Sequence, residues 1–99
     1  MASRRRRFLV AYDIRDPVRL RKVHRTMKEF GWAMQYSVFV ADLDPIELVQ
    51  LRQALGAIIK HTVDSIAFVD CGDPGDCGVN CFSFMGTTVD LPVSGPVVL

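Results

Sequence analysis

The chain has 99 residues, 49% of them hydrophobic, and a formal net charge of +1, which is typical of one domain with a buried core. No run of eighteen or more apolar residues occurs, and the opening MASRRRRF leads into a strand pattern and not into a signal peptide, so these features argue against a membrane span and indicate a soluble, cytoplasmic protein. The near-neutral total hides a division, because residues 1–31 carry ten basic against three acidic side chains, a net of +7, and residues 32–99 carry two against eight, a net of −6.

The first predicted strand covers residues 7–14 and is apolar on both of its alternating faces until Asp13. Such a pattern is typical of a central strand that is covered on both sides. Asp16 then fits the N-cap and Pro17 the first position of a helix, which Gly31 ends. The apolar residues of this helix recur at spacings of three, four and three, so its basic residues are predicted to lie off the buried stripe.

The segment WAMQYSVFVADL, residues 32–43, is rich in strand formers and longer than an ordinary strand. We expect a tight turn near residues 35–37 to divide it into two strands. The Asp-Pro pair that starts the first helix then recurs as Asp44 and Pro45. It precedes a second apolar helix that is predicted to run to about Lys60.

The sequence DSIAFVDC, residues 64–71, predicts another strand. Beyond it glycine and proline interrupt the periodicity, so most of residues 71–99 is predicted to be loop, with CFSFM as one short strand and PVVL as a candidate for another. The order of elements is the βαββαβ pattern of an α+β, ferredoxin-like domain with two helices on one face of an antiparallel sheet. We expect a single domain, residues 1–99, with its core at 7–70, an extra C-terminal strand, and a homodimer that covers the open face of the sheet.

Asp13 is the unusual residue of the first strand, because a carboxylate at the end of a buried strand costs free energy unless it is solvated, paired or bound to a metal. Three interpretations follow. Asp13 could be a turn residue that accepts backbone N–H groups of residues 15–17, it could pair with Arg15 or a helix arginine, or it could be an oxygen ligand of Mg²⁺ or Mn²⁺. In the third interpretation, two copies of Asp13 would meet across the axis of a dimer.

The other candidate groups have simpler interpretations. His24, on the first helix, and His61, at the end of the second, are predicted to pack or to lie at the surface. The three cysteines, Cys71, Cys77 and Cys81, are an odd number with no export signal, so a disulfide framework is not expected, and no fourth ligand lies near them for a zinc site. The basic sector is either a solvated helix face with a tail or a surface that attracts a polyanion.

Several motifs carry a resemblance to a known family. They are AYDIRDPVRLRKVHRTMKEFG, MQYSVF, the stretch from Asp44 to Leu48, and DSIAF. In this order and at these spacings, the chain resembles the small CRISPR-associated adaptation endonuclease family, the partner subunit of the spacer integrase. The resemblance covers about residues 7–70.

The resemblance implies a ferredoxin-like homodimer whose two first-strand aspartates, here Asp13, hold Mg²⁺ or Mn²⁺ for phosphodiester cleavage of RNA or DNA. Tyr12, Ser37 and Phe39 would lie near this catalytic site. Basic residues around the start of the first helix would contact nucleic acid, and the candidates are Arg15, Arg19, Arg21, Lys22 and Arg25. The resemblance further implies that the dimer bridges integrase subunits along a DNA duplex, with residues 71–99 in dimer or partner contacts.

Two alternatives share this fold. An RNA-recognition module has the same topology and stacks bases on sheet aromatics, which Tyr12 and Phe39 could imitate, although the basic aromatic signature of its third strand is missing here. A toxin-like ribonuclease is the other alternative, since such enzymes resemble the same family in fold.

Overall fold

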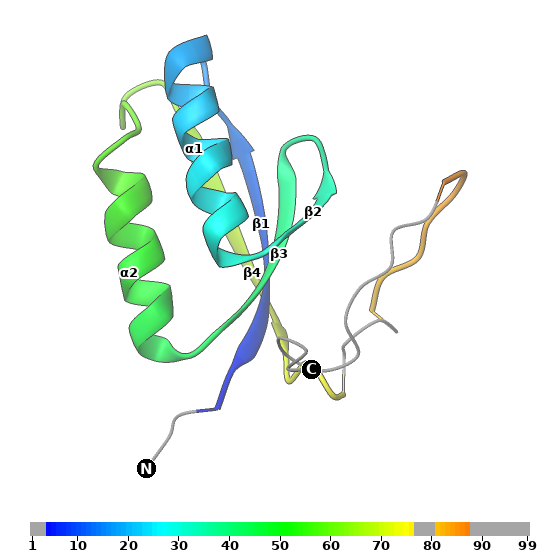
Figure 1. The fold of residues 1–99 in the computed structure, drawn as a ribbon. Helices are drawn as coiled ribbons and strands as arrows, with labels where there is room; N and C mark the ends of the chain where they lie inside the picture. The colour runs from blue at the N-terminus through cyan, green and yellow to red at the C-terminus, as the bar shows by residue number, and fades with distance from the viewer. Residues whose placement is uncertain (1–3, 77–80, 88–99) are drawn as a thin grey trace.

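The structure is a computed structural model that describes residues 4–76 and 81–87. Two helices pack against one face of a four-stranded antiparallel sheet (Figure 1). In chain order, the elements are β1 (Arg6–Asp13), α1 (Pro17–Phe30), β2 (Trp32–Gln35), β3 (Val38–Leu43), α2 (Pro45–Gly56) and β4 (Ser65–Gly72). The strand order β2-β3-β1-β4 confirms the predicted α+β class and is that of a ferredoxin-like sheet. No helix in this part of the chain is both long and apolar enough to cross a membrane.

Both helices begin where the repeated Asp-Pro pair predicts. The Asp16 carboxylate accepts hydrogen bonds from the N–H groups of Val18 and Arg19. Asp44 and Glu47 form a complete capping box, in which each carboxylate accepts the backbone N–H of the other residue at 2.8 and 2.9 Å. These bonds satisfy N–H groups that have no partner within a helix. The carboxylates of both Asp-Pro pairs are therefore used in forming helix ends.

Helix α2 ends at Gly56, four residues before the predicted end at Lys60. Glycine is a poor helix residue, and the chain tightens after it, because the N–H groups of Ile58 and Ile59 both donate to the carbonyl of Leu55. The two isoleucines still pack against the core from this turn. Their apolar pattern extended the prediction, although the helix itself had already stopped.

The hydrophobic core lies between the helices and the sheet. Strand β1 contributes Phe8, Val10 and Tyr12 to it, and these three side chains are at most 8% exposed. Fully buried core side chains of the other elements include Val23, Met27, Phe39 and Leu51. The core thus takes one face of β1, and the other face of the strand points away from both helices.

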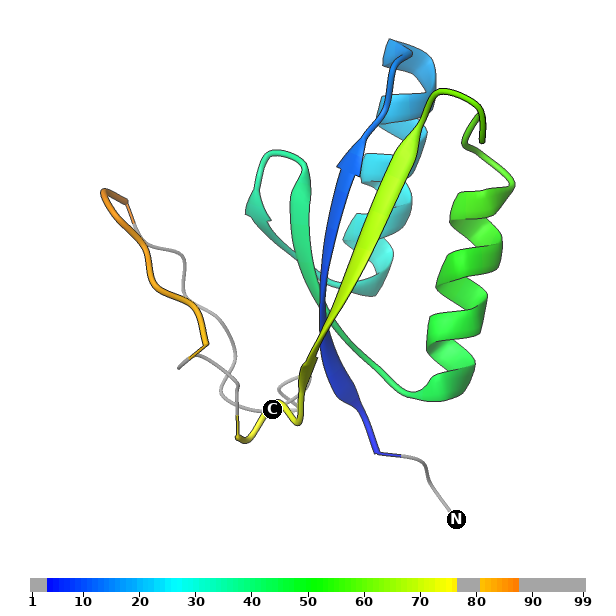
Figure 2. The ribbon, with the colours of Figure 1, turned by 180° about the vertical axis from the view of Figure 1, so that it is seen from behind.

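The face of the sheet that points away from the helices is also largely apolar. In Figure 2, strands β1 and β4 lie in front of α1. At the centre of the apolar face Leu9 pairs with Val40 on one side and with Val69 on the other, so the three side chains share this face. At one end, Arg7 and Asp42 form a fully buried ion pair at 2.7 Å, and the Arg7 guanidinium lies over the ring of Trp32. Because Val69 remains 51% exposed, this face has apolar area left for a partner.

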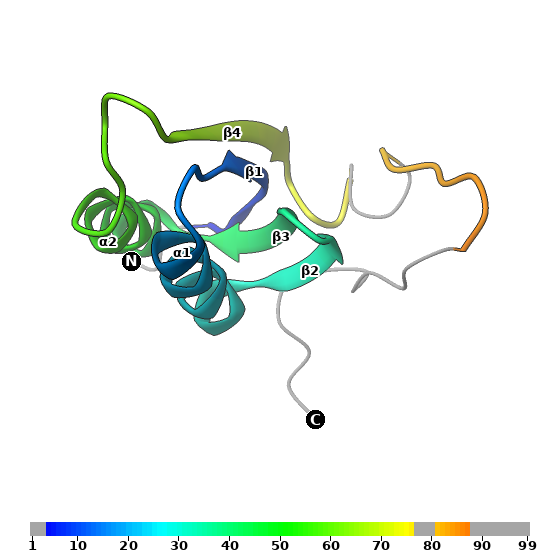
Figure 3. The same ribbon diagram turned by 90° about the horizontal axis from the view of Figure 1, so that it is seen from above.

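The predicted strand at residues 81–85 is wrong, because residues 81–87 contain no strand. A strand needs a neighbour that pairs with its backbone groups, and the described sheet ends at β4 without such a partner. Residues 81–87 lie on the side of the sheet away from the helices (Figure 3). The candidate strand PVVL lies outside the described residues. Cys71 is a free thiol, whereas Cys81 is disulfide-bonded, which the cysteine count did not predict.

Candidate functional site

Asp13 is the last residue of strand β1 and lies opposite Ser65 of β4. Because side chains alternate along a strand, it belongs to the same face as Leu9 and Ala11, away from the helices. Its side chain is 68% exposed, and its carboxylate lies 3.5 Å from an Nη atom of Arg15. Of the three interpretations of Asp13, the ion pair is present, in a weak and solvated form that leaves the carboxylate accessible.

Asp64, just before strand β4, takes the place that the turn interpretation gave to Asp13. Its carboxylate accepts the backbone N–H groups of Arg15 at 2.9 Å and Lys60 at 2.8 Å, and it binds the Arg19 guanidinium through two hydrogen bonds of 2.7 and 3.1 Å. The Arg19 guanidinium and these backbone donors hold the pKa of Asp64 well below its usual range. Asp64 therefore ties the β1–α1 corner to the loop after α2.

The five predicted nucleic-acid contacts differ in their availability. Arg19 is only 25% exposed and is held by Asp64, which raises its pKa. Arg15 is 66% exposed, and its guanidinium lies 3.5 Å from the Asp13 carboxylate. The other three candidates have exposed side chains on α1: Arg21, Lys22 and Arg25. None of these three forms an ion pair within the described chain.

Tyr12, Ser37 and Phe39 are brought together, but not around the Asp13 carboxylate. The Tyr12 and Phe39 rings stack in the core at 6.2 Å between centroids, on the helix side of the sheet. The Tyr12 N–H donates to the Ser37 carbonyl at 3.1 Å, and its hydroxyl lies 3.0 Å from Nδ1 of His24. Burial raises the pKa of Tyr12, so its hydroxyl stays protonated near neutral pH. These residues support the end of β1 through its backbone, and a catalytic role for them stays a prediction.

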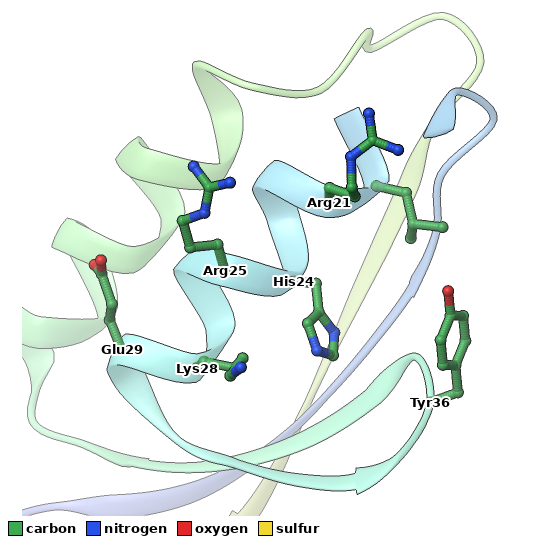
Figure 4. Close-up of a pocket in the computed structure, with 7 residues that line it drawn as sticks. Arg21, His24, Arg25, Lys28, Glu29 and Tyr36 are labelled. Carbon is green, nitrogen blue, oxygen red and sulfur yellow. The ribbon is translucent and has the colours of Figure 1, made fainter. Parts of the chain in front are cut away.

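A cleft that the sequence did not predict lies between α1 and the β2–β3 turn (Figure 4). Its volume is about 480 Å³, and its polar lining consists of Arg21, His24, Arg25, Lys28, Glu29 and Tyr36. The signal was present in the sequence, because residues 21, 24, 25 and 28 follow the helical spacing that places them on one face. What the sequence could not show is that the β2–β3 turn faces this side of the helix.

The N-terminal arginine run, which dominates the basic sector of the sequence, is paired in space. Each of its arginines lies within 2.7 to 2.9 Å of a carboxylate from a distant part of the chain. The pairs are Arg4–Asp73, Arg5–Glu47, Arg6–Asp70 and Arg7–Asp42. Acids between residues 42 and 73 therefore neutralise the run. Within the described residues, α1 carries four cations that form no ion pair: Arg21, Lys22, Arg25 and Lys28.

Comparison with known proteins gives consistent results. Residues 6–76 match the family model of CRISPR associated protein Cas2. A CRISPR-associated endoribonuclease Cas2 of Geobacter sulfurreducens is 35% identical over 83 residues, which are 84% of this chain and 86% of that protein. A second relative of the same kind, from Rhodospirillum rubrum, is 32% identical over 96 residues, with 92% and 98% covered.

Solved structures show the same fold. Cas2 of Streptococcus pyogenes, in a crystal structure at pH 6.5, is 30% identical with a TM-score of 0.73, and the match covers 81% of this chain and 99% of that one. A hypothetical protein of Thermus thermophilus has a TM-score of 0.75 at 26% identity, with 89% and 99% covered. The match therefore spans the whole of these smaller chains.

Proposed function

The chain belongs to the family of CRISPR-associated protein Cas2, and we propose that it is an endonuclease that cleaves phosphodiester bonds of RNA. The names of its relatives, which are CRISPR-associated endoribonucleases, support this activity. The observation that carries it in this chain is the accessible carboxylate of Asp13 at the end of β1. It lies on the apolar face of the sheet that a second copy of the chain would cover.

Asp13 fits a divalent cation such as Mg²⁺ or Mn²⁺ in its chemistry, since carboxylate oxygens are the donors that these ions prefer. Residues 4–76 and 81–87 contain no group of three or more His, Cys, Asp or Glu side chains that could hold a metal, so one subunit offers too few ligands. Two copies of Asp13 across a two-fold axis would offer two carboxylates, which suffice for an ion that keeps several waters. When bound, the ion would supply Lewis acidity toward a phosphate.

The surrounding residues hold the corner that carries this carboxylate. Asp64 fixes the backbone of Arg15, and the exposed Arg15 guanidinium remains beside Asp13, where it can contact a substrate phosphate. The Arg19 side chain is part of the support because it is held by Asp64. We therefore assign Arg15 to substrate binding and Arg19 to positioning.

The activity is tested with Asp13→Asn, which keeps the shape of the side chain and removes its charge. We expect the variant to lose Mg²⁺-dependent cleavage of a labelled RNA, to bind Mn²⁺ more weakly in calorimetry, and to keep the dimer. Asp73→Asn is the matched control, because Asp73 is an acid that pairs with Arg4 beyond the other end of β1. Cleavage by Asp13→Asn at the rate of the unchanged protein would refute the catalytic assignment.

We further propose that the dimer binds a nucleic-acid duplex and bridges subunits of the CRISPR integrase. The observation that favours this second role is the row of exposed cations on α1, of which Arg21, Lys22 and Arg25 form no ion pair within the described chain. Arginine and lysine contacts to phosphates fix the position of a duplex without reading its sequence. Sequence preference is therefore expected to be weak.

The bridging role is tested with Lys22→Glu, which reverses a charge on the exposed side of α1. We expect this variant to lose duplex binding and to keep cleavage of a short RNA, while Asp13→Asn behaves in the opposite way. Integrase capture by the two variants is measured in the same assay with a purified integrase and a duplex. Duplex binding by Lys22→Glu at full strength would contradict the bridge.

A further inference from the structure

The cleft between α1 and the β2–β3 turn, which shares Arg21 and Arg25 with the proposed duplex surface, has the size of a small-molecule site. Its volume of about 480 Å³ falls within the usual range of about 300–1,000 Å³ for ligand pockets. One wall is a face of α1, and the other is the turn that carries Tyr36 (Figure 4). The cleft therefore combines a rigid helix with an aromatic side chain at a hairpin tip.

Tyr36 is a large aromatic side chain with 78% of its surface exposed. Its ring lies 6.3 Å from that of His24 between centroids, and the two planes differ by only 28°. The His24 ring is held by the core, because its Nδ1 lies 3.0 Å from the Tyr12 hydroxyl and it packs edge-to-face with Phe39 at 5.3 Å between ring centroids. A fixed imidazole thus backs Tyr36, and the tyrosine ring offers an open surface for stacking.

The charge around these rings is positive. Arg21 lies one helical turn before His24 and Lys28 one turn after it, and Arg25 adds a third cation to the lining. Glu29 is the acid among the lining residues. None of the three cations forms an ion pair within the part of the chain that the structure describes, in contrast to the four paired arginines of the N-terminus. Their field is available to an anion that enters the cleft.

An exposed aromatic ring beside unpaired cations matches a ligand that has both a flat base and a phosphate. We propose that this cleft binds one unpaired nucleotide of an RNA or DNA strand, with its base stacked on Tyr36 and its phosphate beside Arg21 and Lys28. The proposal rests on the proposed function in nucleic-acid binding and goes beyond it. A duplex presents its phosphates but keeps its bases stacked inside, so it cannot use Tyr36. The cleft therefore selects single strands over duplexes.

The test compares Tyr36→Leu with Tyr36→Phe. Fluorescence anisotropy measures the affinity for a short labelled oligouridylate and for a blunt duplex. Removal of one stacking ring is expected to lower the single-strand affinity about tenfold and to leave duplex affinity unchanged. Tyr36→Phe keeps the ring and should bind as the unchanged protein does. Both substitutions lie at an exposed turn, and thermal unfolding checks that the fold is kept. Equal oligouridylate affinity of Tyr36→Leu and the unchanged protein would overturn the proposal.

Substitution of charged residues that line the cleft gives a second test, in which the two expected changes in affinity have opposite signs. Lys28→Gln is expected to weaken oligouridylate binding, whereas Glu29→Gln removes the competing carboxylate and is expected to strengthen it, each by a few fold. Opposite or absent effects would contradict the phosphate contact. Neither residue belongs to the set proposed for duplex binding, so these variants should bind duplex normally.

The source of the nucleotide is distinguished by competition with free uridine monophosphate. We expect it to displace the oligouridylate only weakly, because a strand adds phosphate contacts along α1. Free nucleotide that binds as tightly as the strand would overturn the assignment to a strand. Failure of the two proposals is separable: loss of duplex binding in Lys22→Glu concerns the bridge, and loss of single-strand preference in Tyr36→Leu concerns the cleft.

Discussion

Besides the helix cap Asp16, two carboxylates lie near the corner where strand β1 leads into helix α1, and their surroundings differ sharply. Asp13 is 68% exposed with one long contact to Arg15, whereas the side chain of Asp64 is fully buried and satisfied by Arg19 and two backbone N–H groups. A carboxylate with these bonds is already used in holding the fold. An accessible carboxylate with a weak partner is the one that can exchange that partner for a ligand.

At the residue scale, Asp64→Asn is expected to lower the stability of the fold in a way that depends on pH. The pKa of Asp64 is depressed in the folded chain, so its contribution is fully present above the ordinary carboxyl pKa of about 4 and is lost as pH falls below that value. Urea midpoints of the two proteins should therefore differ most near neutral pH and converge in acid. Asp76→Asn, in an exposed turn, is the control, and a constant difference across pH would contradict the assignment.

At the scale of elements, the C-terminal end of α1 depends on close packing at Gly31. A Cβ atom there would collide with the Val40 carbonyl oxygen and lie 2.9 Å from the Cβ of Ala41. Gly31→Ala is therefore expected to destabilise the fold by about 1–3 kcal/mol, as overpacking does. Gly56→Ala is the matched control, because nothing lies within 4 Å of its added Cβ, and it should be neutral or stabilise by up to about 1 kcal/mol. Urea unfolding measures both, and equal stabilities would refute the packing argument.

The elements themselves could be predicted because their signals are local. Asp16 and Asp44 act on N–H groups two or three residues away, and Gly31 ends α1 within the same stretch of sequence. The end of α2 was misplaced because the apolar spacing continues through Ile58 and Ile59 after the helix has stopped. Periodicity reports which side chains face the core and does not report whether the backbone remains helical.

The candidate site could be predicted only in part, for the same reason. Asp13 could be chosen as a candidate because a charge at the end of an apolar strand is visible in the sequence. Its neighbour Asp64 meets Arg19 from 45 positions away, and Tyr36 reaches the face of α1 only through the pairing of β2 with β3. Contacts of this kind depend on the tertiary arrangement, and no spacing within one segment encodes them.

At the scale of the whole molecule, the charge division of the sequence is not a charge division in space, because distant acids neutralise the N-terminal arginines. Lys22→Ala should therefore reduce the slope of duplex affinity against salt by about 0.9, the value for one lost phosphate contact. Arg4→Ala removes another exposed cation, one that already pairs with Asp73, and it should change the slope less. Duplex affinity is measured over a series of salt concentrations. Equal slopes for the two variants would contradict the assignment of Lys22 to a phosphate contact.

The proposed dimer would use the face of the sheet that the helices leave uncovered. Val69 is 51% exposed there and neighbours Leu9 across the sheet, whereas Val49 is 53% exposed on α2. If a second copy covers the sheet face, Val69→Glu should convert the dimer to a monomer in sedimentation, because an unpaired charge cannot be buried at low cost. Val49→Glu, with the same chemistry at similar exposure, should remain dimeric.

A comparison of Val69→Glu with Asp13→Asn connects assembly to catalysis. One subunit offers one accessible carboxylate at the end of β1, so a metal held by two copies of Asp13 requires the dimer. Val69→Glu is therefore expected to lose Mg²⁺-dependent cleavage together with the dimer, while Asp13→Asn loses cleavage and keeps it. A monomeric Val69→Glu that still cleaves RNA at the original rate would show that one subunit is enough, and the shared site would then be wrong.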